Sequence, residues 1–479
     1  MLFNSLEFII FFPIVVALYF ALKPKYRWIM LLIASYYFYM CWNYKYIVLI
    51  AFSTCIDYVA GILLYRSKKK TLRILFLLAS LFTNLGLLFF FKYFNFFGDS
   101  LNHIFSKFNI FYRVPAYNFL LPVGISFYTF QTLSYTIDIF KRQREPEYHF
   151  GKFALFVSFF PQLVAGPIER SVNLLPQINK TFHFEYERVK SGILQMCWGF
   201  FKKVVIADRL AEYVNQVYNN PGEYHGAPVI LATVFFAFQI YCDFSGYSDI
   251  AIGSARIMGY ELMTNFRRPY LAVSIQDFWR RWHISLSTWF RDYVYIPLGG
   301  SRVAKWRWHF NLFITFLVSG LWHGAEWTFL IWGALHGFYL VFANITKGQR
   351  NRMNSYIGLT DHPELYRILQ IILTFLLVLF GWIFFRANNS ADAITIIKDI
   401  FAPNTGGVVN LFRIPADFTI ALVSIGLLIF IEIFEEHIQL YEKMQRLARP
   451  MKWAVLTLLI FSVFIFGNWE AQDFLYFQF

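Results

Sequence analysis

The sequence predicts an all-α, polytopic membrane protein, and three observations support this fold class. The first is composition: of the 479 residues, 58% are hydrophobic, 22% are aromatic and only 15% are charged, whereas soluble domains carry about 25% charged residues. The second is the recurrence of apolar windows of about 17–25 residues, the length of a helix that crosses a bilayer. The third is that basic residues gather in short loops between these windows. Together they predict about ten or eleven helical passes, plus re-entrant or interfacial helices.

The expected spans follow one another along the whole chain. They cover residues 6–22, 28–42, 46–65, 74–91, 119–140, 153–168, 191–207, 228–247, 310–342, 369–385, 418–434 and 453–467. The first has no small-residue cleavage site after it, which favours a retained span over a signal peptide. The stretch 310–342 is too long for one upright pass, so we expect it to break at Gly320 or Gly324, or to tilt strongly. No polar stretch exceeds a loop, so we expect one membrane domain, residues 1–479.

The loops between spans predict the orientation of the chain. The basic runs KPKYR, RSKKKTLR and QRLARPMK are expected in the cytoplasm, because short cytoplasmic loops carry the positive excess. Both termini are then extracytoplasmic, and the final NWEAQDFLYFQF has no Lys or Arg. The net charge of +14 follows from these loops at an anionic membrane surface and indicates no nucleic-acid partner. The four cysteines form no CxxC spacing, so no disulfide framework or zinc site is predicted.

Ionisable residues interrupt the apolar pattern mainly between residues 239 and 336. Asp243 and Asp249 lie in FQIYCDFSGYSDIAIG, and Arg280 and Arg281 lie in the aromatic run QDFWRRWHISLSTWF. A charge within a bilayer is costly, so each such residue is a candidate for function. Structural roles remain open for all of them. The acids are expected at helix ends or in pairs with Arg267, Arg268 or Arg280, and the arginines at lipid headgroups or buried acids.

A second group of ionisable residues lies in SGLWHGAEWTFLIWGALHGF. It contains His323, Glu326 and His336. Glu326 follows His323 by one turn and either orients its imidazole or ends a helix. The two histidines lie on different faces of an unbroken helix, so they do not chelate a metal together. His336 is therefore expected to pack or to hydrogen-bond, and from spacing alone catalysis by His323 and a structural role remain equally open.

Six motifs in fixed order are similar to those of a known family. They are FYTFQTLSYTIDIFK, FFPQLVAGPIER, GFFKKVVIADRLA, YCDFSGYSDIAIG, NFRRPYLAVSIQDFWRRWHISLSTWFRDYVYIPLGGSR and GLWHGAEWTFLIWGALHG. The chain resembles the membrane-bound O-acyltransferase (MBOAT) family, in particular its bacterial alginate and peptidoglycan O-acetyltransferase branch, from about Phe3 to about Trp469. The resemblance implies the MBOAT fold around a central tunnel. It places the family core at about 115–345, followed by C-terminal spans and an aromatic tail at 365–479.

The resemblance also implies an activity and its site. The expected reaction is acyl transfer to a hydroxyl, with the family's invariant histidine at His323 and a second signature histidine at His283. A histidine suits this role because its pKa lies near neutral pH. Acetyl-CoA, or another acyl thioester, is the expected donor, with Lys202, Lys203, Arg280 and Arg281 as candidates for its phosphates or tunnel. Asp243, Asp249 and Glu326 are supporting polar residues, and no metal or bound cofactor is expected.

The resemblance further implies partners and a location. The expected location is the bacterial plasma membrane, where a separate exported SGNH-hydrolase-like protein completes transfer to the polysaccharide. Tyr476, in the tail DFLYFQF, is a candidate to carry the acyl group, although an aromatic anchor at the membrane interface is the alternative. Two other functions stay open: transfer of D-alanine toward teichoic acid, and a transporter whose buried polar residues line a solute path. The polymer that is modified and the oligomeric state are not predicted.

Overall fold

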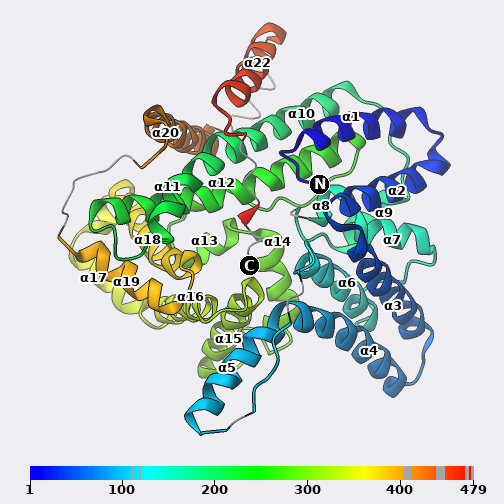
Figure 1. Ribbon diagram of the computed structural model, residues 1–479, viewed down its shortest axis with the longest axis horizontal. Helices are drawn as coiled ribbons and strands as arrows, with labels where there is room; N and C mark the ends of the chain where they lie inside the picture. Colours follow the sequence, from blue (N-terminus) through cyan, green and yellow to red (C-terminus); the bar gives the residue numbers. More distant parts are fainter. Residues whose placement is uncertain are drawn as a thin grey trace. The chain divides into compact units, whose positions relative to one another are not determined.

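The protein is built of helices joined by short loops (Figure 1). The computed structural model describes residues 1–110, 112–117, 120–164, 166–403, 411–438, 448–469 and 474–475. Within these ranges every regular element is an α-, 3₁₀- or π-helix. The all-α fold class is therefore confirmed.

The chain divides into two compact units. The first contains Met1–Met196 and Tyr247–Met263, and the second contains Cys197–Gly246 and Thr264–Phe479. The helices of the first unit are α1 (Leu6–Ala21), α2 (Pro24–Asn43), α3 (Ile47–Arg66), α4 (Lys70–Leu88), α5 (Phe94–Lys107), α6 (Ile125–Phe140), α7 (Phe150–Ser158), α8 (Phe160–Leu163), α9 (Ser171–Ile178) and most of α10 (Tyr186–Phe200). The expectation of one membrane domain stays a prediction.

The second unit carries the motifs that contain the two candidate histidines. Its helices are η3 (Phe201–Ala207), α11 (Asp208–Tyr218), the first part of α12 (Ala227–Met258), α13 (Ile275–Arg281), α14 (Ile284–Phe290), α15 (Lys305–His323), α16 (Trp327–Ile345), α17 (Lys347–Tyr356), α18 (Pro363–Arg386), α19 (Ser390–Phe401), α20 (Pro415–Ile438) and α22 (Arg449–Phe466). Short turns of 3₁₀- or π-helix complete the two units: η1 (Tyr44–Tyr46), η2 (Phe89–Tyr93), η4 (Pro269–Leu271), η5 (Arg291–Tyr295) and η6 (Leu359–Asp361).

Six stretches of the described residues are long and apolar enough to cross a membrane. They are Pro24–Arg66, Lys70–Lys107, Ala227–Met258, Trp327–Ile345, Pro363–Arg386 and Pro415–His437. Two shorter apolar helices, Leu6–Ala21 and Pro450–Phe466, lie near the ends of the chain. All eight overlap spans expected from the sequence. The number of passes stays a prediction, because the first stretch alone contains both α2 and α3.

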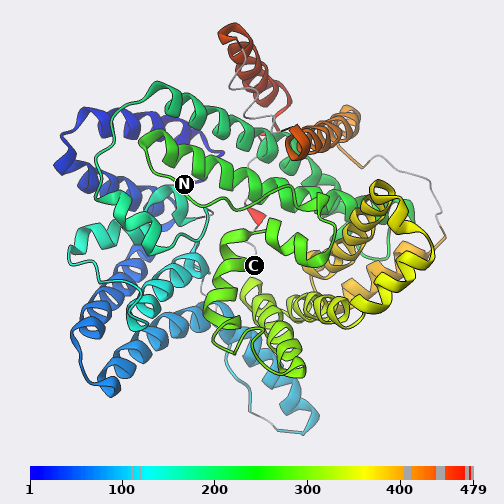
Figure 2. The same ribbon diagram turned by 180° about the vertical axis from the view of Figure 1, so that it is seen from behind.

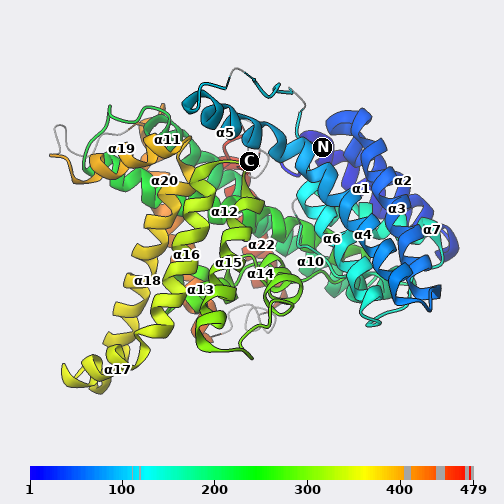
Figure 3. The same ribbon diagram turned by 90° about the horizontal axis from the view of Figure 1, so that it is seen from below.

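The long stretch 310–342 breaks at Gly324, one of the two expected positions. Gly324 adopts an extended conformation after α15 and lets α16 turn back along it. Gly320, the other candidate, lies inside α15 and serves a different purpose. A Cβ at Gly320 would come within 2.3 Å of the Phe329 carbonyl oxygen, and one at Gly333 within 2.5 Å of the Phe316 carbonyl oxygen. These two glycines therefore let α15 and α16 pack backbone to backbone, and the pair can be followed in Figures 2 and 3.

The expected span 153–168 is not one helix. α7 ends at Ser158, Phe159 leaves the helical conformation, and α8 starts again at Phe160. Pro161 explains the break, because proline lacks an N–H and is tolerated in the first turn of a helix but not in its interior. The expectation of a single span at this position was therefore wrong.

In the first unit α3, α4 and α6 pack against one another (Figure 1), and a buried polar cluster holds them together. The Asp57 carboxylate accepts hydrogen bonds from Ser80 Oγ at 2.5 Å and from Asn84 Nδ2 at 2.9 and 3.0 Å. Thr136 Oγ1 lies 3.4 Å from the same carboxylate. A buried polar group needs such partners, because it has left its water. Asp57 was not among the candidate residues expected from the sequence.

Candidate active site

His323 is the last residue of α15 and lies in a cage of aromatic rings. Its side chain is buried, and its ring centroid lies 5.0 Å from that of Trp322, 5.0 Å from that of Trp332 and 5.3 Å from that of Phe385. All three contacts are edge-on. The cage is formed because α15 stops here, so the ring projects between α16 and α18. The rings exclude water from the imidazole.

His283 lies between the short helices α13 and α14 and is fully buried. Its backbone is left-handed, with φ +41°, a conformation that side chains other than glycine adopt rarely. The Oδ1 atom of Asn265 lies 3.0 Å from His283 Nδ1 and also accepts the N–H and hydroxyl of Ser285. Since an amide oxygen only accepts, Nδ1 carries the proton and Nε2 is the basic nitrogen. Burial lowers the pKa of His283 to about 3, which keeps the ring neutral at physiological pH.

The two histidines, about 40 residues apart in sequence, come close together in the second unit. The Trp322 ring centroid lies 5.0 Å from that of His323 and 6.3 Å from that of His283. The two imidazoles therefore lie near the same indole ring. The sequence motifs gave both residues but not their proximity.

The other candidate residues of this region take different positions. Glu326 is exposed just before α16, whereas His323 is buried, so its position fits a helix end better than a partner of the imidazole. His336 is buried, and its Nδ1 accepts the indole N–H of Trp279 at 3.2 Å. This agrees with the hydrogen-bonding role expected for His336.

Lys203 lies between two carboxylates in the interior of the second unit. Its Nζ is 2.7 Å from Asp208 Oδ1 and 2.6 Å from Asp243 Oδ1, and all three side chains are buried. The partner of Asp243 is thus Lys203, carried by the π-helical turn η3, and not one of the arginines considered from the sequence. Buried charges need such pairing because desolvation is costly. Lys202 donates to Ser245 Oγ at 2.5 Å.

Asp249 belongs to the first unit, unlike Asp243. There Asp249 Oδ1 accepts a hydrogen bond from Gln195 Nε2 at 3.1 Å. This glutamine lies on α10, so the contact joins α10 to α12. The two aspartates of the motif therefore belong to different units.

The described end of the C-terminal tail lies close to His283. The backbone N–H of Leu475 donates to Asp243 Oδ2 at 2.8 Å, and Phe474 and Leu475 are both buried. The Phe474 ring lies 5.5 Å from that of Phe244, which in turn lies 4.6 Å from the His283 ring. Tyr476, the acyl-carrying candidate, lies outside the described residues.

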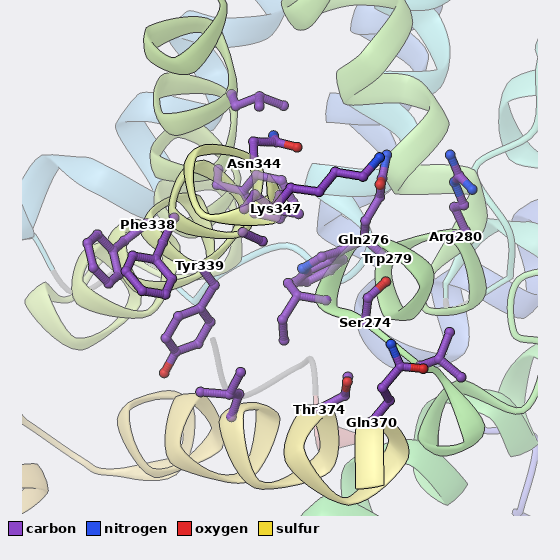
Figure 4. A pocket seen from close by; sticks show the side chains of 18 of the residues that line it. Ser274, Gln276, Trp279, Arg280, Phe338, Tyr339, Asn344, Lys347, Gln370 and Thr374 are labelled. Atoms are coloured by element: carbon purple, nitrogen blue, oxygen red, sulfur yellow. The ribbon is translucent and has the colours of Figure 1, made fainter. Parts of the chain in front are cut away.

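A cavity of about 1360 Å³ opens among α13–α18, and Figure 4 shows part of its lining. Four basic side chains line it: Arg280, Arg291, Lys347 and Arg350. Its described lining contains no Asp or Glu. Figure 4 shows Arg280 and Lys347 at the same end, with Trp279 and Tyr339 further along the wall. The cavity is thus basic in parts and largely apolar elsewhere, which suits an anionic ligand with an apolar portion.

Two residues that line the cavity lie close to His323 or to its aromatic cage. Ser319, which lines it, precedes His323 by one turn of α15. Trp279, which also lines it, has its ring 5.6 Å from that of Trp332, a ring of the cage around His323. Of the four basic residues proposed for donor phosphates, only Arg280 lines this cavity. Arg281 is held instead by Asp277 and Glu436, and Lys202 and Lys203 lie elsewhere.

Sequence reasoning missed two residues that shape this region. Asn265 orients His283, and its signal was present, because it lies in the same motif as His283. Glu436, which binds two arginines of that motif, had only a weak signal as an acid at the end of an apolar span. Both act through contacts between segments far apart in sequence, which residue spacing does not reveal.

Comparison with known proteins identifies the protein family. The family model of MBOAT, the membrane-bound O-acyltransferase family, matches residues 140–387, just over half of the chain. The chain therefore belongs to this family and is an O-acyltransferase. It is a multi-pass membrane protein, as the apolar helices indicated. The matched residues begin and end later than the core expected at about 115–345.

Individual relatives narrow the comparison. The chain is 39% identical to the probable alginate O-acetylase of Pseudomonas aeruginosa, over 86% of this chain and 77% of that protein. It is 35% identical to the peptidoglycan O-acetyltransferase of Helicobacter pylori, over 87% of this chain and 83% of that protein. It is 27% identical to the teichoic acid D-alanyltransferase of Bacillus subtilis, over 57% of this chain and 71% of that protein. The resemblance inferred from the six motifs is thus confirmed.

We predict that Asn265→Asp shifts the pH dependence of the enzyme. A carboxylate beside His283 favours the imidazolium and raises the pKa of His283, which burial holds at about 3 in the native protein. The neutral ring that accepts a proton is then lost as pH falls through the raised pKa, so the acidic limb of activity moves to higher pH. The measurement is the rate of thioester consumption between about pH 5 and 8, a range around the ordinary histidine pKa.

Asn388→Asp is the control for Asn265→Asp, because it makes the same change of charge at an exposed position. It is expected to leave the pH profile unchanged. An acidic limb that stays in place in Asn265→Asp would contradict the role assigned to the Asn265–His283 contact.

Proposed function

We propose that the protein is an O-acetyltransferase that moves acetyl groups from a cytoplasmic thioester, acetyl-CoA, to hydroxyl groups destined for an extracytoplasmic polysaccharide. The observation that carries the proposal is the pair of buried imidazoles that lie near the same Trp322 ring, beside a basic cavity. The names of the relatives that align over most of the chain support acetyl as the group and a polysaccharide or peptidoglycan as the polymer. Family membership favours an enzyme over the transporter that the sequence left open.

The basic cavity is the proposed donor site. Acetyl-CoA carries several phosphates on its nucleotide and a long, weakly polar pantetheine arm, and the lining offers four cations and apolar walls for these parts. α17 supplies Lys347 and Arg350 and also contains Arg352, and such a positive segment is expected at the cytoplasmic face. The acetyl end would then reach His323 past Ser319 and Trp279. Arg280 is retained from the candidates named from the sequence.

The chemistry follows from the neutral state of the imidazoles. His323 accepts the proton of the attacking hydroxyl, the oxygen bonds to the thioester carbon, and the C–S bond breaks. The same proton passes to the departing thiolate, so acyl transfer is balanced without a metal or bound cofactor. His283, near the same indole, is the second histidine proposed to take part, on the acceptor side. Proton transfer supplies about 10² to 10⁴-fold, and exclusion of water by the aromatic cage protects the thioester from hydrolysis.

The acceptor side involves the C-terminal tail and an exported partner. Tyr476 is the proposed first acceptor of the acetyl group, because the two residues before it are buried against Phe244 and Asp243, next to His283. An SGNH-hydrolase-like protein outside the plasma membrane then moves the group to the polysaccharide. Extracytoplasmic termini, as the distribution of basic loops predicts, give the tail access to that partner.

The proposed function predicts that His323→Ala abolishes acetylation of the surface polymer. We expect a loss of about 10² to 10⁴-fold, the contribution of a general base. The measurement is O-acetyl release from the polymer of cells that carry the full-length variant, with mass spectrometry of the released group. His309→Ala, a histidine on the same helix α15 but far from the cage, is the control and should keep full release. Normal release from His323→Ala would overturn the assignment, and D-alanine in place of acetate would favour the alternative cargo.

The donor site predicts a second result. Arg350→Gln should raise the KM for acetyl-CoA about ten-fold with little change in kcat, because a phosphate contact far from the reacting atoms contributes to binding alone. Arg352→Gln, two residues along the same helix and outside the cavity lining, should change neither constant. Equal KM values for the two variants would place the donor elsewhere.

The tail predicts a third result. Tyr476→Phe keeps the aromatic ring and removes the hydroxyl, so polymer acetylation should stop while transfer of the acetyl group from acetyl-CoA to a small soluble alcohol, with release of the free thiol, persists. Tyr356→Phe, at a strongly exposed position, is the control. Full acetylation by Tyr476→Phe would leave the tail as an aromatic anchor and would leave the assignment of His323 intact.

A further inference from the structure

Glu436, near the C-terminal end of α20, binds two arginines of the segment that carries His283. Its Oε2 lies 2.6 Å from Arg268 Nε, and its Oε1 lies 3.1 Å from both terminal nitrogens of Arg281. The Nε of Arg281 is held in turn by both carboxylate oxygens of Asp277, at 3.1 Å. These side chains are largely withdrawn from solvent, with 15% of the Glu436 side chain exposed. Forked guanidinium–carboxylate contacts of this kind fix geometry as well as charge.

The two arginines come from two paired backbone segments, one of which contains His283. The carbonyl of Arg281 accepts the N–H of Arg267 at 2.9 Å, and the N–H of Ile284 donates to the carbonyl of Asn265 at 2.9 Å. Residues 265–268 and 281–284 therefore run beside each other, with His283 and its partner Asn265 inside this pairing. Glu436 binds one arginine from each of the two segments, so it fastens both of them to one point on α20.

This backbone needs such support. His283 has φ +41° and Arg268 has φ +47°, so both lie in the left-handed region that disfavours side chains. A residue keeps this conformation only when its surroundings over-determine it. The hydrogen bonds of Asn265 hold His283 from within the segment, and Glu436 holds the segment from outside. α20 itself is fixed at its opposite end, where Asp417 pairs with Arg209 at 3.1 Å.

We propose that Glu436 is a positioning residue, which makes the C-terminal helix α20 part of the support of His283. α20 lies outside residues 140–387, the part that the family model matches, so this support comes from outside the matched core. The consequence for catalysis depends on the proposed function, since it assumes that His283 takes part in acyl transfer. The consequence for the geometry of His283 does not depend on it.

The test compares Glu436→Gln with Asp417→Asn in the full-length protein. Each variant removes one carboxylate that fastens α20, at opposite ends of the helix. If Glu436 only anchored the helix, the two variants should give the same results. The first measurement is the rate at which diethyl pyrocarbonate modifies His283, followed by mass spectrometry of the peptide. We expect Glu436→Gln to expose the imidazole and raise this rate about ten-fold, and Asp417→Asn to leave it at the native value.

The second measurement is acyl transfer. Glu436→Gln should lower kcat by about ten-fold or more with little change in the KM for the donor, because misplacing a reacting group affects the chemical step. Asp417→Asn should keep the native kcat. Arg268→Gln, which removes one arm and leaves the Arg281–Asp277 pair, should act in the same direction as Glu436→Gln and serves if the latter does not fold.

The outcomes separate the two proposals. An unchanged modification rate of His283 in Glu436→Gln and Arg268→Gln, or equal changes in Asp417→Asn, would overturn the positioning role. Faster modification without any loss of acyl transfer would keep the positioning role and contradict the part assigned to His283 in the proposed function.

Discussion

Burial of uncharged imidazoles among aromatic rings is the constraint on which the candidate site depends. A charged imidazole is expensive in such surroundings, so the base form is the stable one at neutral pH. The partner of His283 is accordingly an amide, Asn265, which fixes the ring without stabilising its charged form. His323 has rings on three sides. Burial thus lowers the pKa of His283 and keeps this imidazole neutral, while the aromatic content of the chain also suits it to a membrane.

Charge is distributed between structural and ligand-facing roles in the second unit. Lys203 lies between Asp208 and Asp243, and Arg281 lies between Asp277 and Glu436, so these cations are neutralised within the protein. In the cavity, Arg291 pairs with the neighbouring Asp292 at 2.8 Å, but the described lining itself contains no acidic residue, so the cavity wall is basic. Two adjacent arginines illustrate the difference, because Arg280 lines the cavity, whereas Arg281 holds the backbone near His283.

Much of the fold could be predicted, because apolar windows and basic loops record the physical demands of the bilayer directly. An error occurred where a local event broke the pattern, as at Pro161. The break expected at Gly320 or Gly324 falls at Gly324, but the pattern did not choose between the two glycines. Both glycines are needed, one for the turn and one for close helix packing, and hydropathy does not distinguish these uses. The motifs supplied His283 and His323. Asn265 was overlooked because an amide carries no charge to mark it against an apolar background.

By itself, the sequence determined the fold class and the family and nominated the two histidines as candidates, because length, hydropathy and ordered motifs are properties of the chain read in one dimension. Only the tertiary structure decided which groups meet. It brought His283 and His323 to the same indole, gave Lys203 rather than an arginine to Asp243, and brought α20 to the segment of His283 through Glu436. The reason is physical: a desolvated charge or donor takes the partner that folding brings within about 3 Å, wherever that partner stands in the chain.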